Sequence, residues 1–307
     1  MSNPRQTVTE QCDLVAGCGA IQQLIHPRDQ DLGGFCVRRA LPNQAIRRIG
    51  PWVFFDHMGP ATFAAGDGID VRPHPHINIA TVTYLFEGEI VHRDSIGSEQ
   101  LIRPGDLNLM VTGSGMVHSE REPPAVKNRP HTVHGLQLWL ALPEKDEETD
   151  PAFYHYPADN LPRVNLNGVS VRIMMGAAYG AISPVRTFSP TLYIEARLKE
   201  GQTLELPKAA QRGLYVLNGD ISLRDTRVPR HTMVVLNDDE DVVIKAEQDT
   251  QIALIGGDDI GSRYMDWNFV SSSKERIEAA IAQWKARQFP IIKNDADEYI
   301  PYPTGKG

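Results

Sequence analysis

The chain has 307 residues, 41% of them hydrophobic, which is typical of a globular protein long enough for two domains. Its formal net charge of −8 argues against direct binding to nucleic acid, and its three cysteines, which lack CxxC spacing, argue against a disulfide framework or a thiolate zinc site. No apolar run could span a bilayer and the N-terminus does not resemble a signal peptide, so we expect a cytoplasmic protein without membrane contact.

Short segments rich in β-branched and aromatic residues run along the chain and are separated by glycines and prolines. Many such segments with turn signals between them are typical of a β-barrel or β-sandwich, so the sequence predicts an all-β fold. The clearest of these segments are ATVTYLF (80–86), LNLMV (107–111), HGLQLWLAL (134–142), TLYIEARL (191–198) and TMVVL (232–236).

Two histidine-bearing segments in the first half predict a metal site. His74 and His76 flank a proline at the start of a strand, so their side chains share a face. His118 and Glu120 also stand two residues apart, in the strand-like segment 113–122. Antiparallel pairing would bring three imidazoles and a carboxylate together, which suits Fe(II), Mn, Ni, Cu or Zn. The alternative is that these histidines are ordinary surface or hydrogen-bonded residues, because an HxH pattern often occurs by chance.

Residues 143–162 are acidic and contain prolines, which predicts a connection between an N-terminal domain (1–150) and a C-terminal domain (151–307). The second domain partly repeats the first, because LYVLNGDISLRD (214–225) aligns with TYLFEGEIVHRD (83–94). We therefore expect two barrels of similar architecture.

The predicted metal ligands do not recur in the second copy. Sliding the first copy onto the second places Glu205 and Pro207 opposite the first histidine pair, and Val243 and Lys245 opposite the second ligand pair. We therefore expect the second barrel to lack metal and to pack against the first. His92 has Leu223 as its counterpart, and it is a candidate for orienting a ligand rather than for binding the metal.

One helix is predicted near the C-terminus. Residues 271–289 place apolar side chains at helical spacing, and Ser272 with Glu275 forms the pattern of a capping box. We expect this helix to pack against a domain edge and to take no part in chemistry.

The histidine blocks also resemble a known family. RPHPH (72–76), RPGD (103–106) and GSGMVHSE (113–120) occur in the order and separation of the pirin signature, and YMDWNFVSSSKERI (264–277) resembles the C-terminal end of pirins. The resemblance covers nearly the whole chain. It implies two tandem cupin (jelly-roll) barrels with a C-terminal helix, the first holding one metal, usually iron. Its ligands would be His74, His76, His118 and Glu120.

The sequence departs from many pirins at INIA (77–80) and at Ser114, both expected beside the metal. These departures leave the ligands intact. We expect them to affect the shape of the substrate site.

The resemblance implies a quercetin 2,3-dioxygenase-like enzyme, which cleaves the central ring of a flavonol with O2. In that interpretation Glu120 binds the metal and also accepts the proton of the flavonol hydroxyl, unless it stays bound to the metal, in which case another group must act as the base. An alternative is an iron-binding, redox-sensitive regulatory protein that acts through protein partners, as a transcription cofactor or a regulator of a metabolic enzyme. A third reading is a metal-stabilised fold with other small-molecule chemistry. We favour the enzyme, because an open metal site is costly to keep for structure alone.

Overall fold

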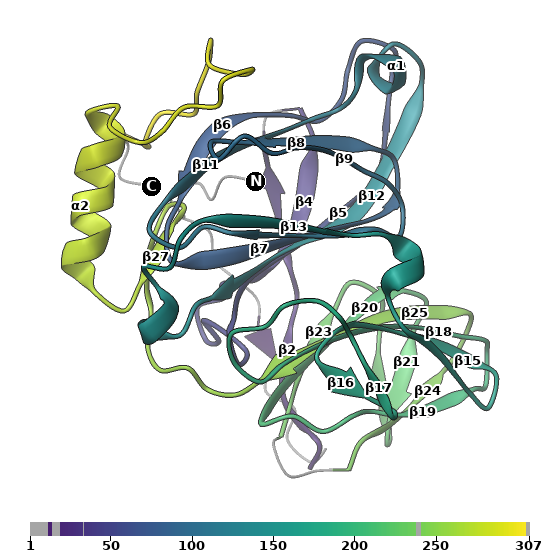
Figure 1. The fold of residues 1–307 in the computed structure, drawn as a ribbon. Coiled ribbons are helices and arrows are strands. Elements are labelled where there is room, and N and C mark those ends of the chain that lie inside the picture. The colour runs from purple at the N-terminus through teal and green to yellow at the C-terminus, as the bar shows by residue number, and fades with distance from the viewer. Residues whose placement is uncertain (1–11, 14–18, 33, 238–240, 305–307) are drawn as a thin grey trace.

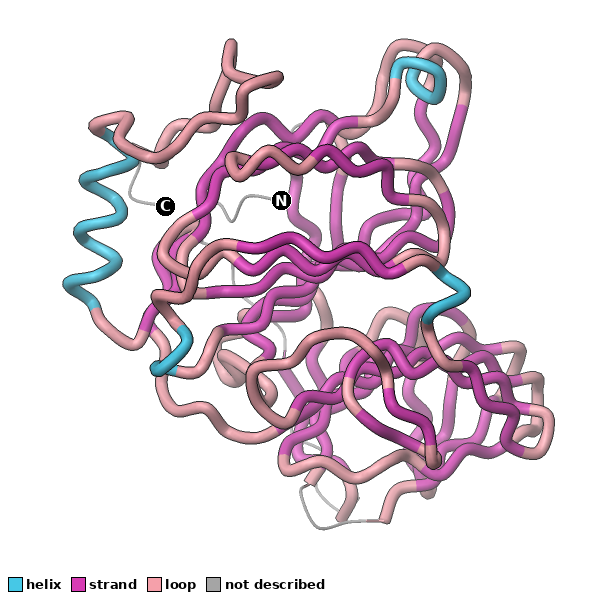
Figure 2. Tube along the Cα trace, in the orientation of Figure 1, coloured by secondary structure: helices cyan, strands magenta, loops and turns pink. Residues whose placement is uncertain are grey.

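The computed structural model describes residues 12–13, 19–32, 34–237 and 241–304. Two β-barrels lie side by side, and a C-terminal helix packs on the first barrel (Figure 1). Figure 2 shows how little of the described chain is helical. The predicted all-β fold of two barrels with a C-terminal helix is confirmed.

The first barrel consists of two antiparallel sheets that face each other. The larger sheet contains, in spatial order, β13 (Ala152–Tyr156), β10 (Leu107–Val111), β7 (Ile79–Glu87), β12 (His131–Ala141), β5 (Trp52–Phe63), β4 (Cys36–Leu41) and β3 (Arg28–Asp31). The smaller sheet contains β6 (Asp70–His76), β11 (Met116–Arg121), β8 (Ile90–Asp94) and β9 (Glu99–Ile102). The short helix α1 (Pro124–Lys127) precedes β12.

The second barrel repeats this plan. Its larger sheet contains β1 (Cys12–Asp13), β2 (Ile21–Ile25), β23 (Met233–Leu236), β20 (Gln211–Asn218), β25 (Thr250–Gly257), β18 (Thr191–Leu198), β15 (Val169–Met175) and β14 (Arg163–Leu166). Its smaller sheet contains β19 (Thr203–Glu205), β24 (Val243–Ala246), β21 (Ile221–Leu223) and β22 (Thr226–Val228). A small hairpin, β16 (Ala177–Ala178) and β17 (Ala181–Ile182), lies beside it. The connecting segments include two 3-10 turns, η1 (Glu144–Asp146) and η2 (Ala158–Asn160).

Successive side chains along a strand point to opposite faces of the sheet. In the larger sheet of the first barrel, both faces are buried. On β7, Val82 and Tyr84 belong to a core shared with the second barrel, where they join Tyr193 and Tyr215. The alternate residues, such as Thr83, face the interior of the first barrel. The interface between barrels is therefore an apolar layer between two sheets, as extensive as a domain core.

Three segments of chain cross the expected boundary near residue 150. Strand β2 pairs with β23 in the second barrel, and β13 pairs with β10 in the first. The hairpin of β26 (Tyr264–Asp266) and β27 (Phe269–Ser271) then returns to the first barrel, where Ile77 bridges to Phe269. The boundary itself stays a prediction.

Helix α2 (Lys274–Lys285) lies within the predicted range, but its cap differs from the expected one. The N-cap is Ser273, whose side chain accepts a hydrogen bond from the Arg276 amide at 3.1 Å. Ser272 cannot serve because its hydroxyl and amide both bond to the Glu147 carboxylate, at 2.8 Å each. The predicted capping box of Ser272 and Glu275 is therefore wrong by one residue. Neither α-helix in the described part of the chain is long and apolar enough to cross a membrane.

Candidate metal centre

Three histidines converge inside the first barrel. Strand β6 supplies His74 and His76, and β11 supplies His118, which stands directly opposite His74 in the antiparallel register. One ring nitrogen from each lies within 4.8 Å of the other two. All three residues are at most 1% exposed. The predicted meeting of these histidines is therefore found in the structure.

Backbone carbonyls fix the tautomers of two of these rings. His74 Nδ1 donates to the carbonyl of Arg72 at 2.9 Å, and His76 Nδ1 donates to that of Asn268 at 3.1 Å. Because a carbonyl can only accept, the proton stays on Nδ1 and Nε2 keeps its lone pair. This arrangement is the usual one for histidines that bind metals.

The buried nitrogens fit a metal ion. His76 Nε2 and His118 Nε2 are buried, and neither has a hydrogen-bond partner among the described residues. Burial lowers the pKa of His74, His76 and His118 well below the usual value, and in His118 the neighbouring histidines lower the pKa further. The imidazoles are thus neutral, as metal binding requires.

A carboxylate orients the third ring through another histidine. His118 Nδ1 lies 3.5 Å from His92 Nδ1, and His92 Nε2 lies 3.0 Å from a carboxylate oxygen of Asp94. Burial raises the pKa of Asp94, but its hydrogen bonds to His92 and Ser98 outweigh this effect and lower the pKa overall. An ionised Asp94 accepts the His92 Nε2 proton. His92 Nδ1 is then the acceptor for His118, which is the arrangement of a residue that orients a ligand.

Glu120 lies on the same face of β11, two residues after His118, and is 2% exposed. It stands directly opposite His92 on β8. Among the residues that the structure describes, the ligand cluster consists of the three imidazoles and no carboxylate joins it. The role of Glu120 as fourth ligand stays a prediction.

The corresponding interior of the second barrel is apolar. Glu205 pairs with Val243 as expected, but both side chains point outward, and Val243 is 50% exposed. The inward positions are Leu206, Val242 and Ile244, at 3%, 1% and 0% exposure. The sequence alignment of the two copies is therefore one residue out of step on these strands, and a one-residue slip exchanges the two faces of a strand.

The segment 77–80, where the sequence departs from many pirins, comprises the two-residue turn between β6 and β7 and the first two residues of β7. Asn78 has a φ of 58°, a left-handed conformation that asparagine adopts more readily than most residues. Its amide donates to the carbonyls of Glu147 and Gly113, at 2.6 and 3.3 Å. The departure thus has a structural role, and its effect on substrate shape stays a prediction.

Other histidines lie outside the cluster. His131 bonds to Glu122 at 2.9 Å and to the carbonyl of Arg129 at 2.7 Å. His57 and His134 bond to each other at 2.9 Å, at the interface between the barrels. These contacts give His57, His131 and His134 structural roles.

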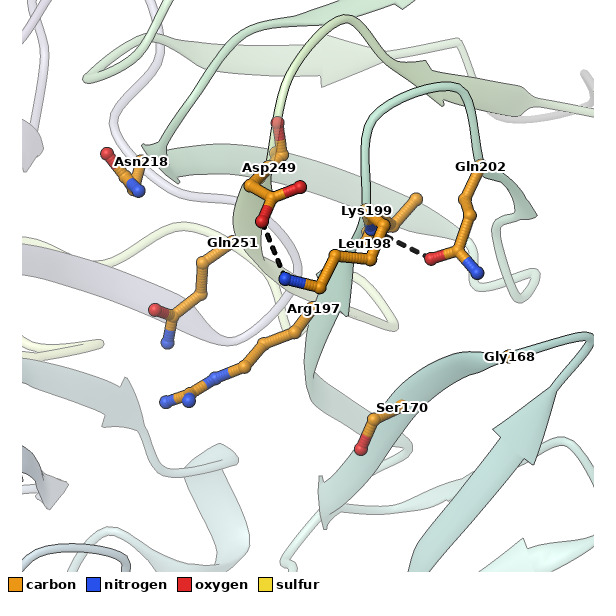
Figure 3. A pocket seen from close by; sticks show the side chains of 10 residues that line it. Gly168, Ser170, Arg197, Leu198, Lys199, Gln202, Asn218, Asp249 and Gln251 are labelled. Atoms are coloured by element: carbon orange, nitrogen blue, oxygen red, sulfur yellow. Dashed lines mark hydrogen bonds and ion pairs between the residues drawn. The ribbon is translucent and has the colours of Figure 1, made fainter.

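A separate pocket of about 340 Å³ lies on the second barrel (Figure 3). Its lining includes Arg197, Lys199 and Asp249, and Lys199 forms an ion pair with Asp249 at 2.6 Å. None of its lining residues belongs to the histidine cluster, and Arg197 forms an ion pair with Glu195 at 3.5 Å. The histidine cluster of the first barrel is therefore the stronger candidate for a functional site.

Comparison with known proteins agrees with this architecture. Residues 34–140 match the Pirin family model, and residues 193–290 match the model of the pirin C-terminal cupin domain. A pirin-like protein of Caulobacter vibrioides is 43% identical over 288 residues, covering 92% of this chain and 99% of its own. A Pseudomonas aeruginosa protein, named as a candidate quercetin 2,3-dioxygenase, is 35% identical over 300 residues, or 94% of this chain and 93% of its own.

A solved structure shows the same fold. The quercetin 2,3-dioxygenase of Acinetobacter baumannii superimposes with a TM-score of 0.85 at 33% identity, covering 92% of this chain and 95% of the other. Sequence similarity, both family models and the two-barrel fold thus agree over nearly the whole chain. The chain belongs to the pirin family of two-barrel cupin proteins.

Proposed function

We propose that this protein is a metal-dependent dioxygenase that opens the central ring of a flavonol, such as quercetin, with O2. The observation that carries the proposal is the convergence of three buried, neutral imidazoles on one point inside the first barrel. The names of the P. aeruginosa relative and of the A. baumannii structure support this choice of reaction.

In this proposal His74, His76, His118 and Glu120 hold Fe(II); Mn, Ni, Cu and Zn suit the same donors. The bound metal would supply a Lewis-acid centre that draws electron density from the flavonol oxygens. The hydrogen bonds from His74 and His76 to backbone carbonyls hold two ligands in position. The carboxylate of Glu120 would accept the proton of the flavonol hydroxyl, as the buried acid nearest to His118 along β11.

Two aromatic side chains would flank the bound substrate. Trp139 lies edge-on to His76, with ring centroids 4.8 Å apart, and Phe153 stacks on His92 at 4.3 Å. Both come from the larger sheet and contact the smaller one beside the histidines. A flat aromatic substrate suits such surroundings.

The test uses protein loaded with Fe(II) under nitrogen, then exposed to oxygen and quercetin. Oxygen uptake and loss of the flavonol absorbance should occur together in the wild type and be abolished in His118→Ala. His131→Ala is the matched control, because His131 bonds to Glu122 and lies outside the cluster, and it should retain turnover. Iron-loaded wild type without turnover would contradict the proposal and favour the regulatory alternative.

A further inference from the structure

Polar side chains form a row across the inner face of the larger sheet of the first barrel. We call Asn108, Thr83 and Gln137 the polar row; they stand side by side on β10, β7 and β12 in the observed register. Their neighbours in sequence, such as Val82 and Leu138, belong to the core shared between barrels. The row therefore faces the barrel interior.

Hydrogen bonds fix how the two amides of the row are oriented. His155 Nδ1 donates to Asn108 Oδ1 at 2.8 Å, and Thr83 Oγ1 donates to Gln137 Oε1 at 2.8 Å. Each amide oxygen is thus used within the protein. The amide nitrogens, Asn108 Nδ2 and Gln137 Nε2, have no hydrogen-bond partner among the residues that the structure describes, although the two residues are only 2% and 0% exposed.

A third donor lies beside the histidine cluster. Trp139 Nε1 is also buried, with no hydrogen-bond partner in the described part of the chain, and its ring contacts that of His76. Because Gln137 and Trp139 are two residues apart on β12, their backbones are about 7 Å apart along the same face. The inner face thus presents one N–H donor next to the candidate metal ligands and two more further along the barrel.

The second barrel shows that the fold does not need polar residues at these places. In its matching register, Val234, Leu214 and Leu254 stand side by side on β23, β20 and β25, and all three are 0% exposed. An apolar row therefore packs well at the same positions. Leaving buried donors unpartnered is costly for a folded protein, so the polar row, found only in the barrel with the histidines, calls for a ligand.

We propose that Asn108, Gln137 and Trp139 determine substrate specificity by donating hydrogen bonds to acceptor oxygens of the substrate. This inference rests on the proposed function of the same site. The substrate would then be a planar molecule with at least two acceptor oxygens, in addition to the group that faces the metal. Sites built to bond such oxygens discriminate strongly against analogues that lack them.

The test compares two flavonols, quercetin and 3-hydroxyflavone, the second of which lacks the additional hydroxyl groups. Their dissociation constants are measured under nitrogen with Fe(II)-loaded wild type, Asn108→Val, Gln137→Leu and Trp139→Phe. The first two substitutions copy the apolar kind of residue found in the second barrel, and Trp139→Phe keeps the aromatic ring. Iron content and melting temperature are recorded for every variant, and Gln137→Met provides a second variant of similar length should Gln137→Leu fold poorly.

Wild type should prefer quercetin, and each substitution should reduce the preference by about tenfold, because one hydrogen bond to a buried donor is lost. Iron content should stay at the wild-type level. An unchanged preference in all variants, with quercetin turnover intact, would overturn this inference alone and would mean that the donors bind ordered water only. Failure of iron-loaded wild type to bind either flavonol would overturn the proposed function and this inference together.

Discussion

The position of a single proton decides whether His118 can bind a metal through Nε2. Its Nδ1 must then carry the proton, and His92 Nδ1 lies 3.5 Å from that nitrogen. His92 accepts there only if its own proton is on Nε2, where Asp94 accepts it at 3.0 Å. The carboxylate of Asp94 therefore sets the tautomer of His118, and it acts through His92.

Asp94→Asn should reverse this chain. The other carboxylate oxygen of Asp94 accepts from the amides of Ile96 and Ser98, at 3.1 and 2.9 Å, so the amide oxygen of Asn will take that place. The NH2 group then faces His92 and forces its proton onto Nδ1, opposite His118. We expect metal affinity to fall by about 10- to 100-fold, which is typical of residues that orient metal ligands.

Metal titration under nitrogen measures this effect, with Asp106→Asn as the control. Asp106 also accepts a backbone amide, that of Ala158, but has no contact with the cluster. An Asp94→Asn protein that binds metal as tightly as wild type would show that His92 and Asp94 do not set the tautomer.

The alternation of side chains along a strand suffices to predict that His74 and His76 share a face, and the assumption that their strand pairs with that of His118 predicts that all three meet. The same rule cannot find Asp94, because its role depends on how β8 pairs with β11. It also cannot find Gln137, whose strand is buried on both faces, so that polarity along the sequence does not show which face is the barrel interior.

At the scale of elements, the C-terminal segment 286–304 holds the two strands that carry the histidines. The amide of Ile300 donates to the carbonyl of Pro73 on β6, at 2.8 Å, and Trp284 Nε1 donates to the carbonyl of Ile300 at 3.1 Å. On β11, Arg121 donates to both carboxylate oxygens of Asp295, at 2.7 and 2.8 Å. The segment thus binds both β6 and β11 from outside the barrel and stabilises their positions.

Arg121→Met should remove the contact between β11 and the C-terminal segment. The Arg121 and Asp295 side chains are 19% and 10% exposed, and a bidentate pair of this kind is stronger than a surface ion pair. We expect the free energy of unfolding to fall by ~1–3 kcal/mol. Hydrogen–deuterium exchange should rise in residues 70–76 and 116–121 before it rises elsewhere.

Arg103→Met is the control, because Arg103 pairs with Glu89 at 3.7 Å and its side chain is 61% exposed. Such a pair contributes less than about 1 kcal/mol. Equal effects of the two substitutions, or unchanged exchange in β6 and β11 of Arg121→Met, would contradict this role of the C-terminal segment.

At the scale of the whole molecule, the two barrels contact each other through equivalent tyrosines. Tyr84 of the first barrel donates to Glu195 of the second at 2.9 Å, and Tyr215 of the second lies 3.1 Å from His57 of the first. The strand pairing shows that the two contacts are equivalent. In the first barrel, Tyr84 and His57 lie on either side of Leu136 in the sheet. In the second barrel, Tyr215 and Glu195 lie on either side of Ala253 in the same way. The interface is therefore approximately two-fold symmetric, with a carboxylate at one contact and an imidazole at the other.

The sequence predicts the duplication but not this interface. The outer face of each larger sheet is as apolar as a barrel interior, as the core shared by Val82, Leu138 and Ile255 shows. Hydrophobic patterning cannot distinguish two such faces. Only the three-dimensional pairing of the barrels shows that the aligned Tyr84 and Tyr215 reach across to each other's domain.

The histidine contact should make stability depend on pH. Burial lowers the pKa of His57 well below its usual value, and it lowers the pKa of His134 and of His231 to about 4. The unfolded chain, in which a histidine has a pKa of about 6.5, therefore binds more protons than the folded protein between these values. The free energy of unfolding should be greatest above pH 6.5 and should fall as the pH is lowered toward 4.

Melting temperatures across this range measure the effect, and His134→Gln is the informative variant. Gln251 occupies the equivalent place at the other contact, where it donates to Glu195 at 2.5 Å, so glutamine suits this geometry. The variant should lose less stability than wild type on acidification. An identical pH dependence in both proteins would show that the interface histidines do not contribute.

The most direct test of the central claim is the metal content of the protein after anaerobic loading with Fe(II) and desalting. Wild type should retain about one iron per chain, because neutral imidazoles fixed by hydrogen bonds form a prepared site. His118→Ala should retain less than about a tenth of that amount, since one of three converging ligands is lost. If His118→Ala held as much iron as wild type, the metal centre would have to lie elsewhere, and the histidine cluster of the first barrel would not be a metal site.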